Sequence, residues 1–411
     1  MTAMWIRKET RPRHRPTAEG GGLLVGLLAI LAGCTAEPDF RLNAVHQRTI
    51  EKEQLDGEAI AGERINEVGD ILTALFGTPA DPVFPDIPGL DPVVDPGNLQ
   101  WAAGPVASDR RGLHSGLYRE HCAHCHGVSG DGAGPTAAAL NPYPRDFRLG
   151  KFKFKSTRMY RPPTDSDLRR ILEDGIPGTG MPSFRLLDEA EQDALVDYVK
   201  YLSIRGMVER ALLEETARLD PDEPLLSPRA EDPEGFDDRL GLVMDEVVIP
   251  VLEKWNDRER NVTDVPSLPE DFFETRKVLG TNGRALFFGK ANCGQCHGPT
   301  GLGDGQTRNF DEWTNEWLKR AKVDENNPLE IAEFVELGAL PPRRLRPRNL
   351  AHKVFRGGGT PTDLYRRIAD GIEGSSMPAA SGLNSEEVWA LVAYVLEIGF
   401  LDMEGHEGHD H

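Results

Sequence analysis

The chain has 411 residues, enough for roughly two or three modest domains, and its formal net charge is −20. A charge of this sign opposes binding to nucleic acid and to anionic lipid, so it favours a protein partner with a basic surface. The chain contains five cysteines, and four of them form two Cys-x-x-Cys pairs.

Residues 1–33 have the pattern of a secretory signal. Five basic residues precede an apolar run of ten residues from Leu23 to Ala32, whereas a helix that crosses a bilayer takes about 20. A basic start with a short apolar run indicates a segment that is removed on maturation. The ending Leu31-Ala32-Gly33-Cys34 resembles the lipobox of bacterial lipoproteins, which implies cleavage before Cys34 and lipidation of that cysteine. An ordinary signal peptide that ends near a cysteine is the alternative.

Loss of residues 1–33 would remove five of the 47 Lys and Arg residues and two of the 67 Asp and Glu residues, which makes the net charge −23. Residues 34–104 are then predicted to form a helical and proline-rich tether. Gln47 to Leu75 has apolar residues at helical intervals, and six prolines follow between Thr78 and Gly97. A proline-rich segment is extended and semi-rigid; a solvated leader without further role is the alternative.

Residues 105–206 are predicted to form the first of two similar units. The unit contains Cys122-Ala-His-Cys125-His126, a Cys-x-x-Cys-His pattern that is typical of c-type haem attachment. A glycine-rich turn follows, then a short helix that ends at Asp174, and then a loop that ends in Met181-Pro182. Asp188 with Glu191 predicts the capped start of a last helix.

Residues 207–274 are predicted to be a linker. Met207 to Leu219 should prolong the last helix of the first unit, and Asp220 to Pro233 is acidic and rich in proline. Leu240 to Trp255 has the pattern of a helix that Pro250 breaks or kinks.

The second unit, residues 275–402, repeats the order of the first, and a His-rich tail covers 403–411. Its motif is Cys293-Gly-Gln-Cys296-His297, and its loop ends in Met377-Pro378. In both units the methionine lies 13 residues before the alanine of an Ala-Leu-Val-x-Tyr-Val sequence and six residues after a glycine. This matched spacing indicates an internal duplication of one module.

The units differ by an insert in the second one. With Pro144-Arg145 and Pro347-Arg348 as a common register, the second unit gains 32 residues between its histidine and this point. The insert, about 310–340, carries Trp313 and Trp317 one helical turn apart. Such a stripe is either a docking surface or, more commonly, part of a core.

The two motifs predict covalent haem binding. Residues i and i+3 lie on one face of a helix, so both thiols of a pair can reach the vinyl groups of one haem, and the next residue, His126 or His297, meets the iron as its proximal ligand. The rival interpretations are a four-cysteine zinc site and thioredoxin-like redox pairs, which would need a βαβ context.

The order of motif, short helix, Met-Pro loop and terminal helix resembles class I cytochrome c over roughly 106–206 and 276–402. The resemblance implies a mainly α fold with two tandem cytochrome c-like haem-binding domains, joined by a partly helical linker, and two covalently bound haem c groups. In that family the methionine of the distal loop is the sixth iron ligand, at Met181 and Met377 here; ordinary core methionines are the alternative. The family also supplies a Gly-Pro whose backbone holds the proximal imidazole, which matches Gly134-Pro135, whereas the second unit has Gly305-Gln306.

These inferences together predict a membrane-anchored dihaem cytochrome that carries electrons on the periplasmic side of a bacterial membrane. With both axial positions filled, the iron would only pass electrons, so the chain is expected to be no enzyme. The expected partners are redox proteins, namely a quinol-oxidising complex, a terminal oxidase or a soluble cytochrome. The lipid anchor would attach the chain to the membrane. The alternatives are a dihaem peroxidase-like enzyme and a fixed, non-catalytic haem subunit, similar to the dihaem subunit of some haem–copper oxidases.

Seven basic residues gather between Arg145 and Arg161 in this acidic chain. They are expected either to neutralise haem propionates, to present a positive patch to a partner, or to form a solvated loop.

Overall fold

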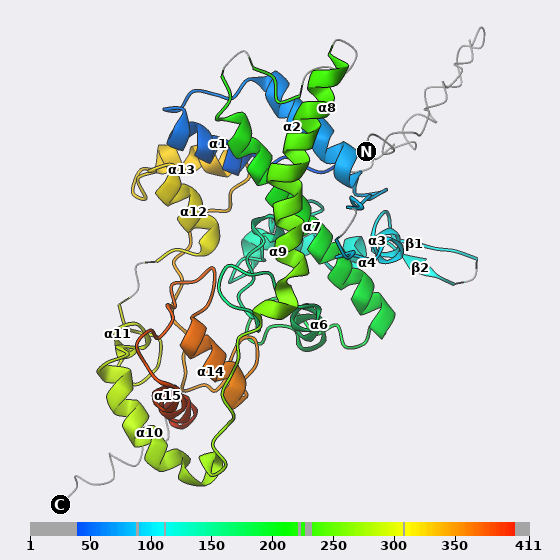
Figure 1. The fold of residues 1–411 in the computed structure, drawn as a ribbon. Coiled ribbons are helices and arrows are strands. Elements are labelled where there is room, and N and C mark those ends of the chain that lie inside the picture. The colour runs from blue at the N-terminus through cyan, green and yellow to red at the C-terminus, as the bar shows by residue number, and fades with distance from the viewer. Residues whose placement is uncertain are drawn as a thin grey trace, which may run out of the picture. The chain divides into compact units, whose positions relative to one another are not determined.

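The computed structural model describes residues 39–398 apart from 88–89, 111, 221–222, 227–231 and 307–308. Helices dominate these residues (Figure 1), and the one sheet among them is a two-stranded antiparallel ribbon of β1 (Ala107–Ser108) and β2 (His114–Ser115). The prediction of a mainly α fold is therefore confirmed. The signal segment 1–33, Cys34 and the tail 403–411 lie outside the described residues. Within the described ranges, every helix is too short or too polar to span a membrane.

Three helices precede the first unit and pack against α7 (Glu189–Thr216): α1 (Ala44–Gln54), α2 (Gly62–Phe76) and α3 (Pro96–Ala102). Val68 and Leu72 on the apolar face of α2 are fully buried in the same core as α7. The Tyr201 hydroxyl of α7 donates a hydrogen bond to Phe76 O at the end of α2. The helical part of the predicted tether is thus present, but α1 and α2 pack in a core, because the amphipathic face of α2 gains more free energy there than in water.

The first unit contains α4 (Leu117–His121), α5 (Ala123–His126), η1 (Ala137–Ala139), η2 (Phe147–Leu149), α6 (Asp165–Asp174) and α7. The predicted capping box at the start of α7 is present, since Asp188 accepts from the Glu191 amide and the Glu191 carboxylate accepts from the Asp188 amide. The helix then runs on to Thr216, so it supplies the last helix of the unit and the predicted prolongation into the linker.

The linker forms a nearly continuous helix despite its proline. It consists of α8 (Pro233–Leu242), the π-helical turn η3 (Val243–Val248), α9 (Ile249–Asn256) and η4 (Arg258–Asn261). In the wider π turn the Ile249 amide donates a hydrogen bond to Met244 O. This turn accommodates Pro250, which has no amide hydrogen to donate. The proline therefore does not break the helix, and Trp255 at its end is fully buried in the core of the first unit.

The second unit has its own core between α10 (Phe272–Phe288), α14 (Pro361–Asp370) and α15 (Ser385–Glu397), and its motif forms α11 (Gly294–His297). The two longest of these helices approach closely at Gly283 of α10, where an added Cβ would lie 2.0 Å from Ala390 O of α15. Only glycine permits this backbone-to-backbone distance.

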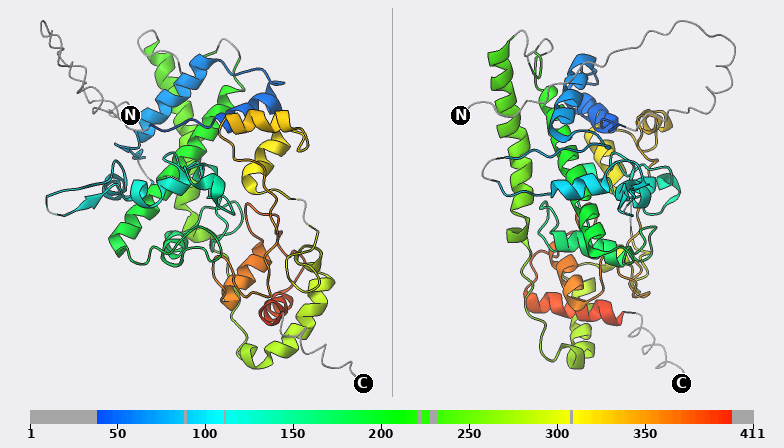
Figure 2. Two further views of the ribbon diagram at one scale, coloured as in Figure 1. Left: turned by 180° about the vertical axis from the view of Figure 1, so that it is seen from behind. Right: turned by 90° about the vertical axis from the view of Figure 1, so that its right-hand side faces the viewer.

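The insert forms two helices, α12 (Glu312–Arg320) and α13 (Pro328–Glu336), which lie beside α1 (Figures 1 and 2). Trp317 is 1% exposed and stacks on Phe334 with ring centroids 4.7 Å apart. Glu333 of α13 pairs with Arg48 and Lys52 of α1, at 2.6 and 2.7 Å. Of the two interpretations of the aromatic stripe, a docking surface or part of a core, Trp317 therefore supports the core.

Candidate functional site

The first Cys-x-x-Cys-His motif lies where the short helices α4 and α5 meet. Cys122 is buried between them and Cys125 is partly buried, and burial raises the pKa of the Cys122 thiol to about 12. The hydroxyl of buried Tyr118 donates to Gly127 O at 2.9 Å, which fixes the end of α5 against α4. The pair of thiols is thus held on a rigid turn with an apolar side.

The proximal histidine of the first unit has a defined tautomer. His126 Nδ1 lies 3.0 Å from Arg145 O, and because a carbonyl only accepts, Nδ1 must carry the proton. Nε2 is then the nitrogen with a lone pair, which is the form that a metal ligand needs. Phe147 stacks on the ring at 4.5 Å, and burial lowers the pKa of His126 to about 4, which keeps the imidazole neutral.

The second unit repeats this arrangement. His297 Nδ1 lies 3.1 Å from Arg348 O, and burial lowers the pKa of this histidine too. The expectation that Gly134-Pro135 orients His126 is therefore wrong, and His297 is oriented in the same way although Gln306 stands where the first unit has a proline. The carbonyl of a Pro-Arg step serves both units. The signal was in the sequence, since Pro144-Arg145 and Pro347-Arg348 align in the two repeats, but nothing local marked their carbonyls as acceptors.

Gly134 and Gly305 have a different role. Gly134 N donates to Cys125 O at 3.0 Å, and an added Cβ would lie 2.6 Å from Ala123 O. A Cβ on Gly305 would lie 2.4 Å from Gln295 O. Both glycines therefore let the chain cross directly beneath the carbonyl end of the motif helix, which holds the helix in place.

The two methionine loops have the same internal hydrogen bonds. Ile176 N donates to Met181 O at 3.1 Å, and Ile372 N donates to Met377 O at 3.0 Å. A hydroxyl two residues before each methionine accepts from the methionine amide, Thr179 at 3.1 Å and Ser375 at 3.2 Å. The sequence duplication is thus a duplication of loop conformation.

Each methionine shares a core with the motif of its own unit. Met181 packs against the core that contains Cys122 and Phe147, and Met377 packs with Cys293 against the core of the second unit. The described residues contain no group of three or more His, Cys, Asp or Glu side chains that could hold a metal. The four cysteines therefore do not gather as a zinc site requires, whereas one imidazole, one thioether and two thiols per unit suit a covalently bound haem.

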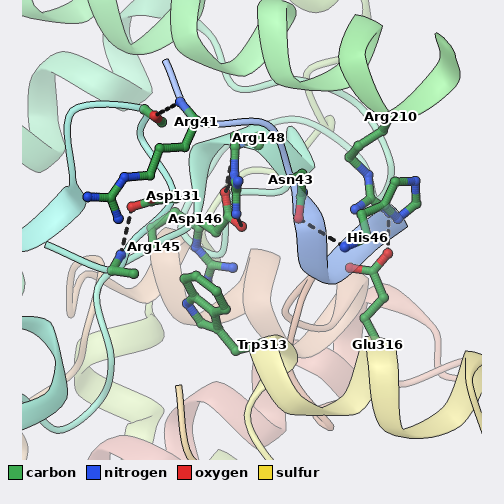
Figure 3. Close-up of polar contacts among 12 residues, drawn as sticks. Arg41, Asn43, His46, Asp131, Arg145, Asp146, Arg148, Arg210, Trp313 and Glu316 are labelled. Carbon is green, nitrogen blue, oxygen red and sulfur yellow. Dashed lines mark hydrogen bonds and ion pairs between the residues drawn. The ribbon is translucent and has the colours of Figure 1, made fainter. Parts of the chain in front are cut away.

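The segment that holds His126 is itself tightly packed. Asp146, next to Arg145, forms a buried two-pronged ion pair with Arg148, with distances of 3.0 and 2.9 Å (Figure 3). Trp313 of the insert donates from Nε1 to Pro144 O at 3.1 Å. A cavity of about 20 Å³ separates this pair from His46 of α1, which is 2% exposed. The insert and α1 thus close over the segment that orients the first histidine.

The basic run that begins at Arg145 is partly internal. Lys155 forms an ion pair with Glu373 of the second unit, and both side chains are 5% exposed. Tyr160 N donates to the same carboxylate at 3.1 Å. At the same boundary, Arg170 of α6 lies 2.7 Å from Asp363 of α14. Part of the run therefore joins the two units and does not form a solvated loop.

A family model, described as cytochrome c, matches residues 115–203 and 280–399. No curated protein sequence matches this chain significantly. Among solved structures, a chain of the reducing HAO-like protein complex of Kuenenia stuttgartiensis aligns with a TM-score of 0.41 and 22% identity, over 72% of this chain and 98% of that chain. The expectation that this chain is no enzyme is corrected here, because the aligned chain belongs to a complex that is described as reducing and HAO-like.

Proposed function

This chain belongs to the cytochrome c family, and on that premise we propose that it binds two haem c groups and relays electrons between redox proteins outside the cytoplasm. Haem-based electron transfer follows from the family. The number of haems, their ligands, the anchor and the respiratory setting are our proposal. The observation that carries it is the repeated pairing of a Cys-x-x-Cys-His motif with a backbone carbonyl that fixes the histidine tautomer.

We assign thioether attachment to the four motif cysteines, Cys122, Cys125, Cys293 and Cys296. His126 and His297 would bind the iron through Nε2, since the Nδ1–H of each is held by a carbonyl. A bound haem supplies an iron that cycles between Fe(II) and Fe(III). The hydrogen bonds to Arg145 O and Arg348 O raise the basicity of the two imidazoles and prevent the rings from turning.

Met181 and Met377 are proposed as the sixth ligands. Their loops are closed by the matched amide–carbonyl bonds, so each thioether is held by the backbone before a metal is bound. A soft thioether favours Fe(II) and raises the reduction potential relative to a second imidazole.

The cellular setting is proposed from the sequence alone. Lipidation of Cys34 would anchor the mature chain to the periplasmic side of a bacterial membrane. The net charge of −20 favours a partner with a basic docking face. A quinol-oxidising complex as donor, and a terminal oxidase or soluble cytochrome as acceptor, would suit this placement.

Haem counting tests the proposal. The purified chain should yield two haems in a pyridine-haemochrome assay after acid-acetone extraction, and C122A/C125A should yield one. A purified protein that carries zinc and shows no Soret band would refute the proposal. The anchor is tested separately, because Cys34→Ala should move the protein from membranes to the soluble periplasmic fraction with both haems retained.

A further inference from the structure

Two arginines of the second unit contact the methionine loop of the first. Arg356 Nη2 donates to Gly178 O at 3.0 Å. Arg348 Nη2 lies 3.5 Å from Pro177 O, and a Cβ added to Gly178 would lie 2.6 Å from the same nitrogen. Both guanidinium groups therefore rest on the turn that leads into Met181.

Arg348 also belongs to the second haem site. Its carbonyl accepts the Nδ1–H of His297 at 3.1 Å, and its Nε donates to Val354 O at 2.9 Å, which fixes the side chain beneath its own unit. One residue thus contacts the proximal histidine of one site through its backbone and the methionine loop of the other site through its side chain.

The charges of this arginine pair are not balanced by protein. Among the described residues neither Arg348 nor Arg356 forms an ion pair with a carboxylate, although Lys155 and Arg170 at the same boundary do. Arg356 Nε is buried without a hydrogen-bond partner. Burial lowers the pKa of Arg348, and burial together with the Arg348 charge lowers that of Arg356. Both groups are partly buried and carry like charges, so a nearby anion would stabilise the pair.

We propose that Arg348 and Arg356 form a carboxylate site that takes a haem propionate at the boundary of the units, and that Arg348 thereby couples the two haem sites. The inference rests on the proposed function, which supplies a carboxylate-bearing group close to the Met181 loop. A fixed positive charge near an iron stabilises Fe(II) over Fe(III), because the reduced haem carries one positive charge less. The charge of Arg348 acts on both haems, since the residue adjoins both sites.

The coupling is tested by spectropotentiometric titration of the dihaem protein and of three variants. R348Q removes the charge, leaves a shorter polar side chain and keeps the backbone carbonyl, and it should shift both midpoint potentials to lower values. R348K keeps the charge and should leave both close to wild type. R346A is the matched control, because Arg346 is exposed and lies two residues away on the same segment; it should shift neither.

Three results would overturn the coupling. The first is that R348Q shifts only one midpoint potential or neither, and the second is that R346A shifts them as much as R348Q does. The third is a shift in R348K as large as that in R348Q, which would assign the effect to side-chain shape and not to charge. Each variant must first give two haems by pyridine haemochrome. A wild-type chain without two haems would refute the proposed function instead, so the two failures are distinguishable.

A second arm identifies the anion. With a haem propionate in the site, the potentials of the wild type and of R348Q should respond equally to inorganic phosphate at constant ionic strength. A phosphate dependence of the wild type that R348Q abolishes would show that the site takes a free anion and would overturn the assignment to propionate.

Discussion

Glu373→Ala should destabilise the protein strongly, because it removes the carboxylate that joins the two units. The Glu373 side chain is 5% exposed, lies in the loop that ends at Met377, and accepts from both Lys155 Nζ and Tyr160 N. Its loss leaves a buried ammonium group and a backbone amide without their acceptor. Removal of one partner of a buried ion pair costs about 3–5 kcal/mol, which is a large share of the stability of a typical domain.

The assay is urea denaturation of the purified protein, followed by far-UV circular dichroism. Glu325→Ala is the control, because the pair of Glu325 with Arg344 is exposed (41% and 48%) and should contribute about 0–1 kcal/mol. K155M/E373L, which removes both charges and fills the space with apolar atoms, should recover the part of the loss that comes from the unpaired ammonium group, while the Tyr160 amide stays without its acceptor. The reasoning fails if Glu373→Ala costs no more than Glu325→Ala, or if the double variant is as unstable as the single one.

Three further predictions concern other parts of the chain. Met377→Ala should open a coordination position on the second iron, so that carbon monoxide binds the reduced variant faster than the reduced wild type in stopped-flow measurements. Equal rates would reject Met377 as a ligand. Gly283→Ala should lower the free energy of unfolding by about 1–3 kcal/mol through overpacking, since its Cβ would meet Ala390 O. Gly241→Ala, whose Cβ meets nothing within 4 Å, should instead stabilise its helix by up to about 1 kcal/mol. Urea denaturation midpoints would compare the two variants. Burial alone would raise the pKa of Asp363, but Thr360 and Arg170 outweigh it and lower that pKa, so Asp363 stabilises the fold above its unfolded pKa and this stability is lost as pH falls through the lower folded value. The deficit of Asp363→Asn in unfolding free energy should therefore shrink between pH 7 and strong acid, and a deficit that stays constant would contradict this role.

The helix starts could be predicted from the sequence because capping is local. The box of Asp188 with Glu191 joins residues three positions apart and forms as predicted, and Asn384 with Glu387 forms the same box in the second unit. The two methionine loops could likewise be predicted from the sequence, since each loop closes within six residues and occurs in both units with the same spacing. Interactions between residues that are close in the sequence can therefore be predicted from the sequence pattern.

The parts that the sequence did not predict depend on contacts between distant residues. His126 and its acceptor Arg145 are 19 residues apart, and His297 and Arg348 are 51 apart. The acceptors are carbonyls of irregular backbone, which any residue type supplies, so no side-chain pattern marks them. The apolar stripe of α2 was visible, but its burial against α7 depends on a fold that a local pattern does not specify.

The contacts around Pro144-Arg145 connect the insert to the segment that orients His126, even though Trp317 of the insert is core. Trp313 binds Pro144 O, one residue before the carbonyl that holds His126, and buried Trp317 fixes the helix that carries Trp313. An insertion in the second unit thus packs on the segment that orients His126, while Arg348 of the second unit contacts the loop that leads to Met181. The loop of Met377 is held in turn by the first unit, since its Glu373 accepts from Lys155 and from Tyr160 N. Each methionine loop is therefore held in part by the other half of the duplication, so the two halves pack together and are not merely linked.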